Sequence, residues 1–242
     1  MAEFGPTPIL TLDLSSPAAT GFRVPDFQAS QLLAPLFVQH RFTALTTVVL
    51  RNTPVAADDV ALLRVLPALS TLDLCATGLT NPALYHLVCH GRTLASLNVA
   101  NNEGISDEVW PVFAALHRLA ALYLRGTGFS LPALRLLVSS LPAGCRLLSM
   151  PAPAIHHLNS LHTKYCVDIP EGYIANPAQL ASGGASSGMQ VLKKNLELHA
   201  KYNRDVLVSG SKADLVHRLR TLLLGRQADL KLISVLGRQQ QQ

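Results

Sequence analysis

The residues of this chain whose types could do chemistry gather in its last third. Gly184, Ser186 and Gly188 fit the pattern G-x-S-x-G, in which a serine serves as a nucleophile. That use requires an apolar strand before the serine and a helix packed after it. Here the pattern lies within residues 182–188, a run of glycine, serine and alanine that is typical of a flexible linker. We therefore expect no serine nucleophile.

A histidine and a cysteine in the same region have the types of metal ligands. His162 and Cys166 are four residues apart, a spacing that would place them one turn apart on a helix, and His157 precedes them. A closed zinc site needs four convergent ligands, and no second pair is evident. The chain also lacks a P-loop, a G-x-G-x-x-G and an H-E-x-x-H. We therefore expect no catalytic residue, no metal and no cofactor, and a protein that is not an enzyme.

A third set of residues suits the binding of phosphate. Residues 209–219 have the pattern of a helix start, with Ser211 as N-cap and Asp214 completing an approximate capping box. The amino end of a helix offers backbone N–H groups to an anion, and here a hydroxyl and an ammonium group would join them. The candidate nucleic-acid-binding residues are Lys193, Lys194, Gly210, Ser211, Lys212 and Arg218.

This segment resembles the SAP motif family. The pattern S-G-x-K-x-x-L-x-x-R-L is matched by Ser209, Gly210, Lys212, Leu215, Arg218 and Leu219. The resemblance covers residues 189–224 and implies two short helices, joined by a tight loop, that bind DNA. The family has Gly-Leu at the start of this loop, where the present chain has Asp205 and Val206. The alternative is a helical pair that packs against protein and whose basic residues are its solvated face.

A repeat predicts the elements that precede this region. The pattern L-x-x-L-x-L-x-x-(T/N) starts at residues 45, 69, 94 and 119, with weaker copies near residues 9 and 145. In each copy, L-x-L places alternate side chains inward from a short strand, and the Thr or Asn can hydrogen-bond the turn backbone. The rest of each copy has the pattern of a helix. Strand and helix at this period predict a parallel sheet that lines a solenoid.

The repeat resembles the leucine-rich repeat family of the ribonuclease-inhibitor-like type. The resemblance covers residues 9–150 and is strong for residues 45–129. It implies an α/β fold, a curved solenoid with a parallel sheet on its concave face, and a protein partner bound to that face. The alternative is that these strand residues are solvated and bind nothing. The candidate protein-binding residues, which the pattern places on that face or just after it, are Arg51, Asp73, Asn98, Tyr123 and Arg125.

The sequence predicts five segments along the chain. They are an N-terminal cap or first divergent repeat at residues 1–44, the repeats at 45–150, an irregular segment with the Gly/Ser linker at 151–188, the SAP-like helical module at 189–224, and a helix with a polar tail at 225–242. The linker predicts that the repeats and the C-terminal module act semi-independently.

Composition excludes several classes of protein. The 242 residues are 49% apolar and 14% charged, with a mean hydropathy of +0.27, which is too apolar for a disordered or fibrous chain. No stretch of about 18 residues is continuously apolar, so we expect no membrane span. The four cysteines are widely spaced and no secretory pattern opens the sequence, so we expect free thiols and an intracellular location. The SAP resemblance implies that this location is the nucleus.

The formal charge of +5 is unevenly distributed along the chain. Residues 189–242 contain ten Lys and Arg against four Asp and Glu, which gives +6, whereas residues 1–188 give −1. This favours an anionic partner for the C-terminal part alone. We therefore expect a non-enzymatic adaptor that binds an unidentified protein through its repeats and duplex DNA through its basic helix pair. The alternative is a pure protein-interaction scaffold, for example a ubiquitin-ligase or signalling subunit, in which the C-terminal helices are structural.

Overall fold

The protein is an α/β protein whose chain divides into two units. The computed structural model describes residues 9–15, 33, 42–180 and 188–236. The repeat unit comprises Met1–Ala154 with Val235–Gln242, and the helical unit comprises Ile155–Ser234. Most of the predicted N-terminal cap, most of the Gly/Ser linker with its G-x-S-x-G serine, and the polar tail lie outside the described residues.

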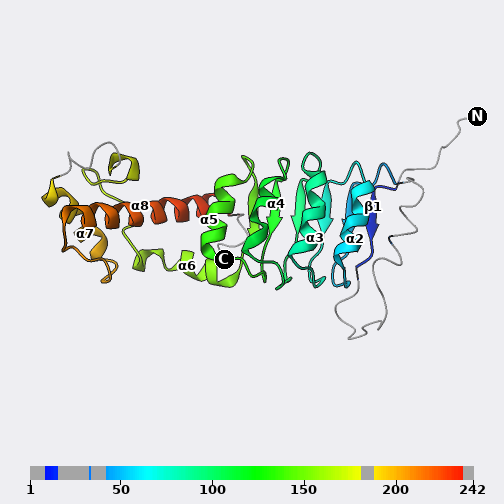
Figure 1. Cartoon of the computed structure of the whole chain (residues 1–242), viewed down its shortest axis with the longest axis horizontal. Helices are drawn as coiled ribbons and strands as arrows, with labels where there is room; N and C mark the ends of the chain where they lie inside the picture. Colours follow the sequence, from blue (N-terminus) through cyan, green and yellow to red (C-terminus); the bar gives the residue numbers. More distant parts are fainter. Residues whose placement is uncertain (1–8, 16–32, 34–41, 181–187, 237–242) are drawn as a thin grey trace, which may run out of the picture. The chain divides into compact units, whose positions relative to one another are not determined.

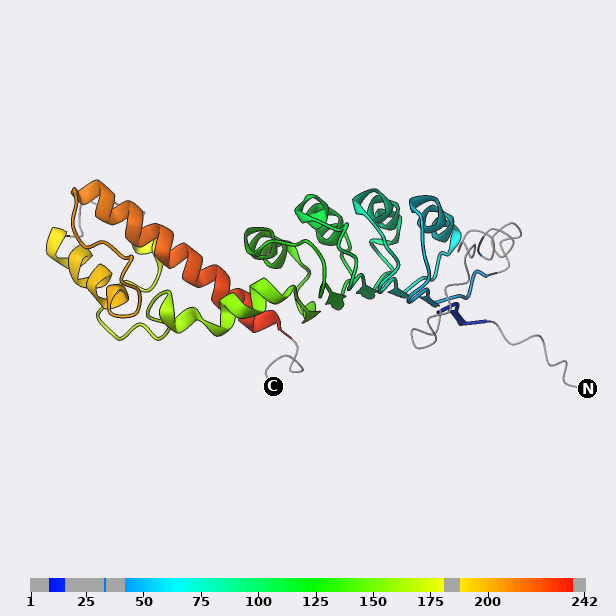
Figure 2. The same cartoon turned by 90° about the horizontal axis from the view of Figure 1, so that it is seen from below.

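The repeat unit contains a six-stranded parallel sheet whose strand order follows the chain. From β3 to β6, each strand returns beside its predecessor because a short helix crosses back over the same side of the sheet (Figures 1 and 2). The predicted α/β class and parallel sheet are therefore confirmed. The strands are β1 (Thr11–Asp13), β2 (Thr47–Val49), β3 (Thr71–Asp73), β4 (Ser96–Asn98), β5 (Ala121–Tyr123) and β6 (Arg146–Ser149).

The helices of the repeat unit are short and several continue as 3₁₀ turns. Between β2 and β6 they are α2 (Ala57–Leu62) with η1 (Leu63–Val65), α3 (Asn81–Tyr85) with η2 (His86–His90), η3 (Asp107–Val109) with α4 (Trp110–Ala114), and α5 (Leu131–Ser140). Helices this short are marginal on their own. They are held because each buries an apolar side against the sheet, as Leu84 and Phe113 do without solvent exposure.

The middle residue of each strand from β2 to β6 is buried, and its neighbours are half-buried or exposed. Leu72 pairs with Leu97 in register, so the same position of successive repeats forms a continuous apolar row. The turns after β2, β3, β4 and β5 each contain a residue in the left-handed region, which is Asn52, Ala76, Asn101 and Gly126 in turn. The chain therefore turns at an equivalent position in each of these repeats.

The helical unit is built from helices that come later in the chain. They are α6 (Ala152–Asn159), η4 (Leu161–Thr163), η5 (Pro177–Leu180), α7 (Met189–Ala200) and α8 (Lys212–Val235). The start of α6, up to Ala154, and the last residue of α8, Val235, are assigned to the repeat unit. After α8, Leu236 forms an isolated parallel bridge with Leu147 of β6.

The predicted segments differ from the structure in two places. Residues 151–188 were expected to be irregular, but α6 lies there, because a proline at the second position of a helix needs no intrahelical N–H partner. A boundary was also expected between residues 224 and 225, but α8 continues across it. Gly225 costs a helix only about 1 kcal/mol, and the buried Leu223 and Leu232 on either side supply apolar packing.

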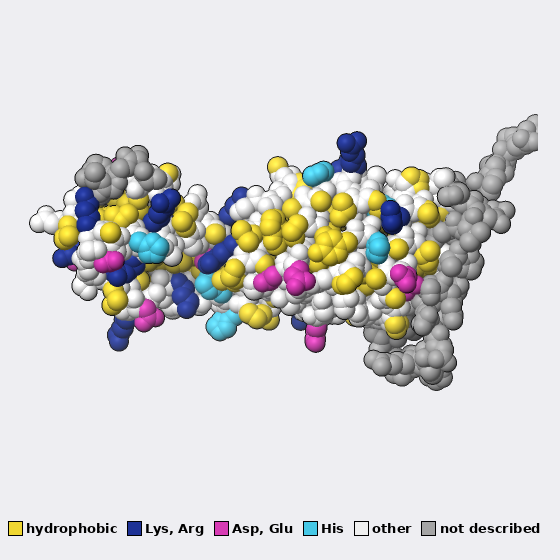
Figure 3. Space-filling view, in the orientation of Figure 1, with side chains coloured by type: hydrophobic (Ala, Val, Ile, Leu, Met, Phe, Trp, Pro, Cys, Tyr) yellow, Lys and Arg dark blue, Asp and Glu magenta, His cyan; other side chains and the backbone are white. Residues whose placement is uncertain are grey.

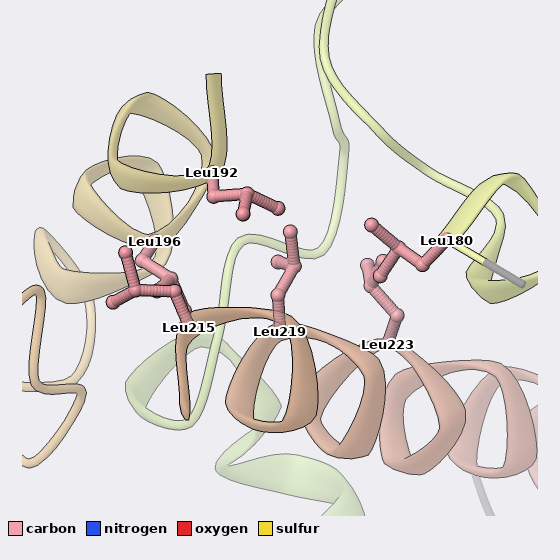
Figure 4. Close-up of a cluster of buried hydrophobic side chains, with 6 residues drawn as sticks. All are labelled: Leu180, Leu192, Leu196, Leu215, Leu219 and Leu223. Carbon is pink, nitrogen blue, oxygen red and sulfur yellow. The ribbon is translucent and has the colours of Figure 1, made fainter. Parts of the chain in front are cut away.

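Six leucines form the core of the helical unit: Leu180, Leu192, Leu196, Leu215, Leu219 and Leu223. Those of α7 and α8 recur at helical spacing and point toward one another (Figure 4). Val206 and Val208, from the segment between the two helices, pack against the same core. The two predicted C-terminal helices and the chain between them are therefore one packed structure. In the described part of the chain, no helix is both long and apolar enough to cross a membrane.

Candidate nucleic-acid interface and protein-binding row

The amino end of α8 has the capping box that the sequence predicts. The Ser211 hydroxyl donates to Asp214 Oδ2 at 2.7 Å, the Ser211 N–H donates to the same oxygen at 3.0 Å, and the Asp214 N–H donates to Ser211 Oγ at 3.2 Å. These hydrogen bonds from Ser211 lower the pKa of Asp214. Two of the donors expected to meet a phosphate therefore already hold a carboxylate. The predicted phosphate contact through the Ser211 hydroxyl is not supported by this geometry.

Arg218 and Gly210 also have structural roles near this helix start. Arg218 Nη1 donates to the carbonyl oxygens of Leu207 at 2.5 Å and Ser209 at 3.1 Å, so it holds the segment that leads into α8. Gly210 has φ +136°, which a residue with a side chain rarely adopts. Both residues of the SAP-like pattern thus shape the loop.

The predicted lysines lie on the two long helices of the helical unit. Lys194 of α7 is exposed and its Nζ lies 4.9 Å from the centroid of the Tyr173 ring, a cation–π contact. Lys193 of α7 and Lys212 of α8 are half-buried. All three add positive charge to this unit.

Further cations lie in the helical unit beside those predicted. Lys201, Arg204 and Arg220 are exposed and form no ion pair with any described residue. They belong to the ten Lys and Arg that make residues 189–242 basic. On the face seen in Figure 3, Lys and Arg side chains gather over the part of the molecule that contains α7 and the first turns of α8.

The carboxylates of the helical unit do not balance these cations. Residues 155–234 contain ten Lys and Arg against six Asp and Glu, a formal charge of +4. Asp214 is engaged in the capping box, and Asp229, with no solvent exposure, accepts hydrogen bonds from inside the unit. The unit therefore has a surplus of positive charge, which includes the exposed side chains of Lys201, Arg204 and Arg220.

The predicted protein-binding residues of the repeat unit lie at the ends of the strands, on a surface that we call the sheet row. Three of them are on strands β3, β4 and β5, and Arg51 and Arg125 each follow two residues after a strand, β2 and β5. Asp73, Asn98 and Tyr123 are neighbours in strand register, as the repeat spacing predicts. Arg51 Nη2 lies 2.6 Å from Asp73 Oδ2, and this ion pair joins the segment after β2 to β3. Arg125 is exposed, and its backbone N–H donates to Ser149 Oγ at 3.2 Å.

Two members of this row also shape the backbone. Asp73 Oδ1 accepts a hydrogen bond from the Cys75 N–H at 3.0 Å, and Asn98 Oδ1 accepts one from the Ala100 N–H at 3.0 Å. These are Asx-type turns, which end each strand where the chain leaves the sheet. Among the described residues, the side chains of Tyr123 and Arg125 form no such hydrogen bond to the backbone. They are therefore the side chains of the row best placed to contact a partner.

The residues with the types of metal ligands do not converge on one site. His157 Nε2 lies 3.0 Å from Asp229 Oδ2, and Cys166 Sγ donates to the carbonyl oxygen of Asp168 at 3.2 Å. His162 is exposed. Within the described residues, no three His, Cys, Asp or Glu side chains are grouped so that they could hold a metal ion.

Comparison with known proteins adds no relative to this picture. A scan against models of protein families finds none that matches the chain, and a search of curated proteins finds no match. The charge of the helical unit can attract a polyanion, and the sheet row can present a tyrosine and an arginine to a protein.

Proposed function

We propose that this protein is a non-enzymatic adaptor that binds duplex DNA through its helical unit and a protein partner through the sheet row of its repeat unit. The observation that carries the first part is the surplus of exposed cations, with Lys201, Arg204 and Arg220 outside any described ion pair. Cations of this kind displace the counterions that surround a nucleic-acid backbone, which drives binding in dilute salt.

The second part rests on the repeat. Four in-phase copies, the strand register and the helices on one side of the sheet support the proposal that the repeat unit is a leucine-rich repeat solenoid. Its sheet face would then carry the partner, with Tyr123 and Arg125 as the main contacts. Tyrosine and arginine are the residue types that most often dominate protein interfaces. A protein that joins DNA to such a partner would act in the nucleus.

The DNA part is tested by binding of the full chain to duplex DNA across a salt series. We expect tight binding at low salt and a steep loss as salt rises. Lys201→Gln with Arg204→Gln should weaken binding and reduce the salt slope by about two, close to one for each lost phosphate contact. The matched control is Arg64→Gln with Arg118→Gln, which removes the same charge from exposed positions of the repeat unit. Equal effects of the two pairs, or no binding by the wild type, would contradict the proposal.

The alternative, a pure protein scaffold, is favoured by one observation. The SAP-like pattern would assign Ser211 and Arg218 to DNA, but both side chains donate their hydrogen bonds to other groups of the protein. A scaffold predicts that the wild type fails to bind duplex DNA even at low salt, so the salt series decides between the two functions.

The protein-binding part is tested with a photo-crosslinking amino acid placed at Tyr123. We expect it to capture one protein of defined mass in cells, and Arg125→Ala to reduce that capture. The same crosslinker at Tyr85, which is exposed on the helical side of the repeat unit, is the control. If both positions capture the same proteins equally, the sheet row is not the partner site.

A further inference from the structure

One leucine is turned outward by the segment that joins α7 to α8. Leu207 is 59% exposed, whereas Val206 and Val208 on either side of it pack against the leucine core of the helical unit. Burial alternates from residue to residue, as it does in an extended segment, in which successive side chains point to opposite sides. Anchoring both neighbours in the core leaves the Leu207 side chain directed away from it.

The backbone on both sides of Leu207 is fixed by side chains. Arg218 donates to the carbonyl oxygens of Leu207 and Ser209. Upstream, Asn203 Oδ1 accepts from the Asp205 N–H at 3.0 Å, and Asn203 Nδ2 donates to the Lys164 carbonyl at 3.2 Å. The exposed leucine is therefore presented on a braced loop, so its placement costs little conformational entropy on binding.

The loop tip combines apolar and basic groups. Arg204 and Tyr202 are exposed on the same connection, and Tyr202 is 48% exposed. Asp205 is the acid of this segment, and the two lysines at its ends, Lys201 and Lys212, lie in the same region of the chain. An apolar tip among cations differs from a plain phosphate-binding surface, because phosphate groups themselves give a leucine side chain no apolar atom to contact.

We propose that Leu207 is an apolar contact inside a groove of duplex DNA and that Arg218 is a positioning residue that holds it there. The inference rests on the proposed DNA binding and adds what that binding reads. Proteins that enter a groove place apolar side chains against base edges, sugars or base steps, while basic groups beside them hold the backbones. Arg218 acts through the loop, which accounts for its two hydrogen bonds to carbonyl oxygens.

The test compares duplex DNA with heparin, a polyanion that has no base groove, using the full chain. Leu207→Ala should lower affinity for duplex DNA about fivefold, from the loss of buried apolar surface. It should leave the salt slope and heparin affinity unchanged, because no charge is removed. The control is Leu224→Ala, which removes a leucine that is 49% exposed on α8 and should change neither affinity.

A second variant tests the positioning role. Arg218→Lys keeps the charge but cannot place the same planar donor against the two carbonyl oxygens. It should lower duplex affinity about as much as Leu207→Ala, again with an unchanged salt slope. The double variant should lose less than the product of the two single losses, because both act through the same contact. Circular dichroism of each variant shows whether the helices are intact, and if Arg218→Lys unfolds, Leu207→Ala alone decides.

The outcomes separate the two claims. If the wild type does not bind duplex DNA, the proposed function fails, and this inference fails with it. If the wild type binds and Leu207→Ala behaves like Leu224→Ala, the groove contact is overturned while DNA binding stands. Equal loss of duplex and heparin binding by Leu207→Ala would also overturn it, because that result indicates a change in the charged surface.

Discussion

The Asn102 side chain holds the turn of the preceding repeat through Thr77. Asn102 Oδ1 accepts hydrogen bonds from the Thr77 N–H at 3.1 Å and from Thr77 Oγ1 at 3.2 Å. The amide nitrogen of Asn102 donates to the carbonyl oxygens of Leu74, Val99 and Ala100. Both residues are buried, so this pair satisfies turn groups that have no strand partner.

Asn102→Ala should therefore destabilise the repeat unit by about 3 kcal/mol, because it leaves several buried backbone groups without partners. Asn102→Asp should also destabilise it, since a carboxylate would face three carbonyl oxygens. Thr127→Val at the equivalent position of the next repeat removes one hydrogen bond, to the Leu124 carbonyl, and should cost about 1 kcal/mol. Urea unfolding measures these values. Equal costs for Asn102→Ala and Thr127→Val would contradict the role assigned to Asn102.

Asp229 should be the carboxylate on which the helical unit most depends. It has no solvent exposure and accepts hydrogen bonds from His157 Nε2 at 3.0 Å and Tyr165 Oη at 2.8 Å. Asp229→Ala should cost about 3 kcal/mol, because it leaves the buried Tyr165 hydroxyl without its acceptor and removes the partner of the half-buried His157. Hydrogen exchange of the α8 amides reports the loss. Asp168→Ala, at an exposed carboxylate of the same unit, should leave exchange unchanged.

His199 should make the helical unit sensitive to acid. Burial, and then the nearby charge of Arg226, lower the pKa of His199 to about 4. The unfolded chain, in which a histidine has a pKa near 6.5, therefore binds the proton more readily than the folded chain. The contribution of His199 to the free energy of unfolding is therefore fully present above about pH 6.5. It falls by roughly 3 kcal/mol as the pH drops toward 4.

The measurement is urea unfolding of the wild type and of His199→Gln at pH 7 and pH 4. The variant should lose less stability between the two values, whatever its stability at pH 7. His217→Gln, at an exposed histidine of α8, should retain the wild-type pH dependence. The same pH dependence in wild type and His199→Gln would show that His199 is not responsible.

The four cysteines should react with a thiol reagent in two groups. All are free thiols, as their spacing predicts, with Cys89 exposed, Cys75 half-buried, and Cys145 and Cys166 buried. Burial raises the pKa of Cys145 to about 11, which suppresses its thiolate further. Intact-mass measurement after brief maleimide treatment should show labelling at Cys89 first and at Cys75 next. Early labelling of Cys145 would indicate that the core of the repeat unit opens.

Local features of the fold could be predicted from the sequence because their physics is local. A buried residue at every second position of a strand, the Thr or Asn of each turn and the capping box at Ser211 all depend on neighbours a few residues away. The repeat also allowed a prediction at longer range, because a constant repeat length places the same position of successive repeats side by side in the sheet. The alignment of Asp73, Asn98 and Tyr123 followed from that alone.

The tertiary structure decided what each polar side chain does. The sequence assigned Arg218 to phosphate, but its guanidinium donates to the carbonyl oxygens of Leu207 and Ser209, which only the folded backbone brings into reach. Asp229 is 72 residues from His157, and no spacing rule connects them. Local periodicity determines which residues enter the core, whereas hydrogen-bond partners depend on distances that are fixed only when the helices pack.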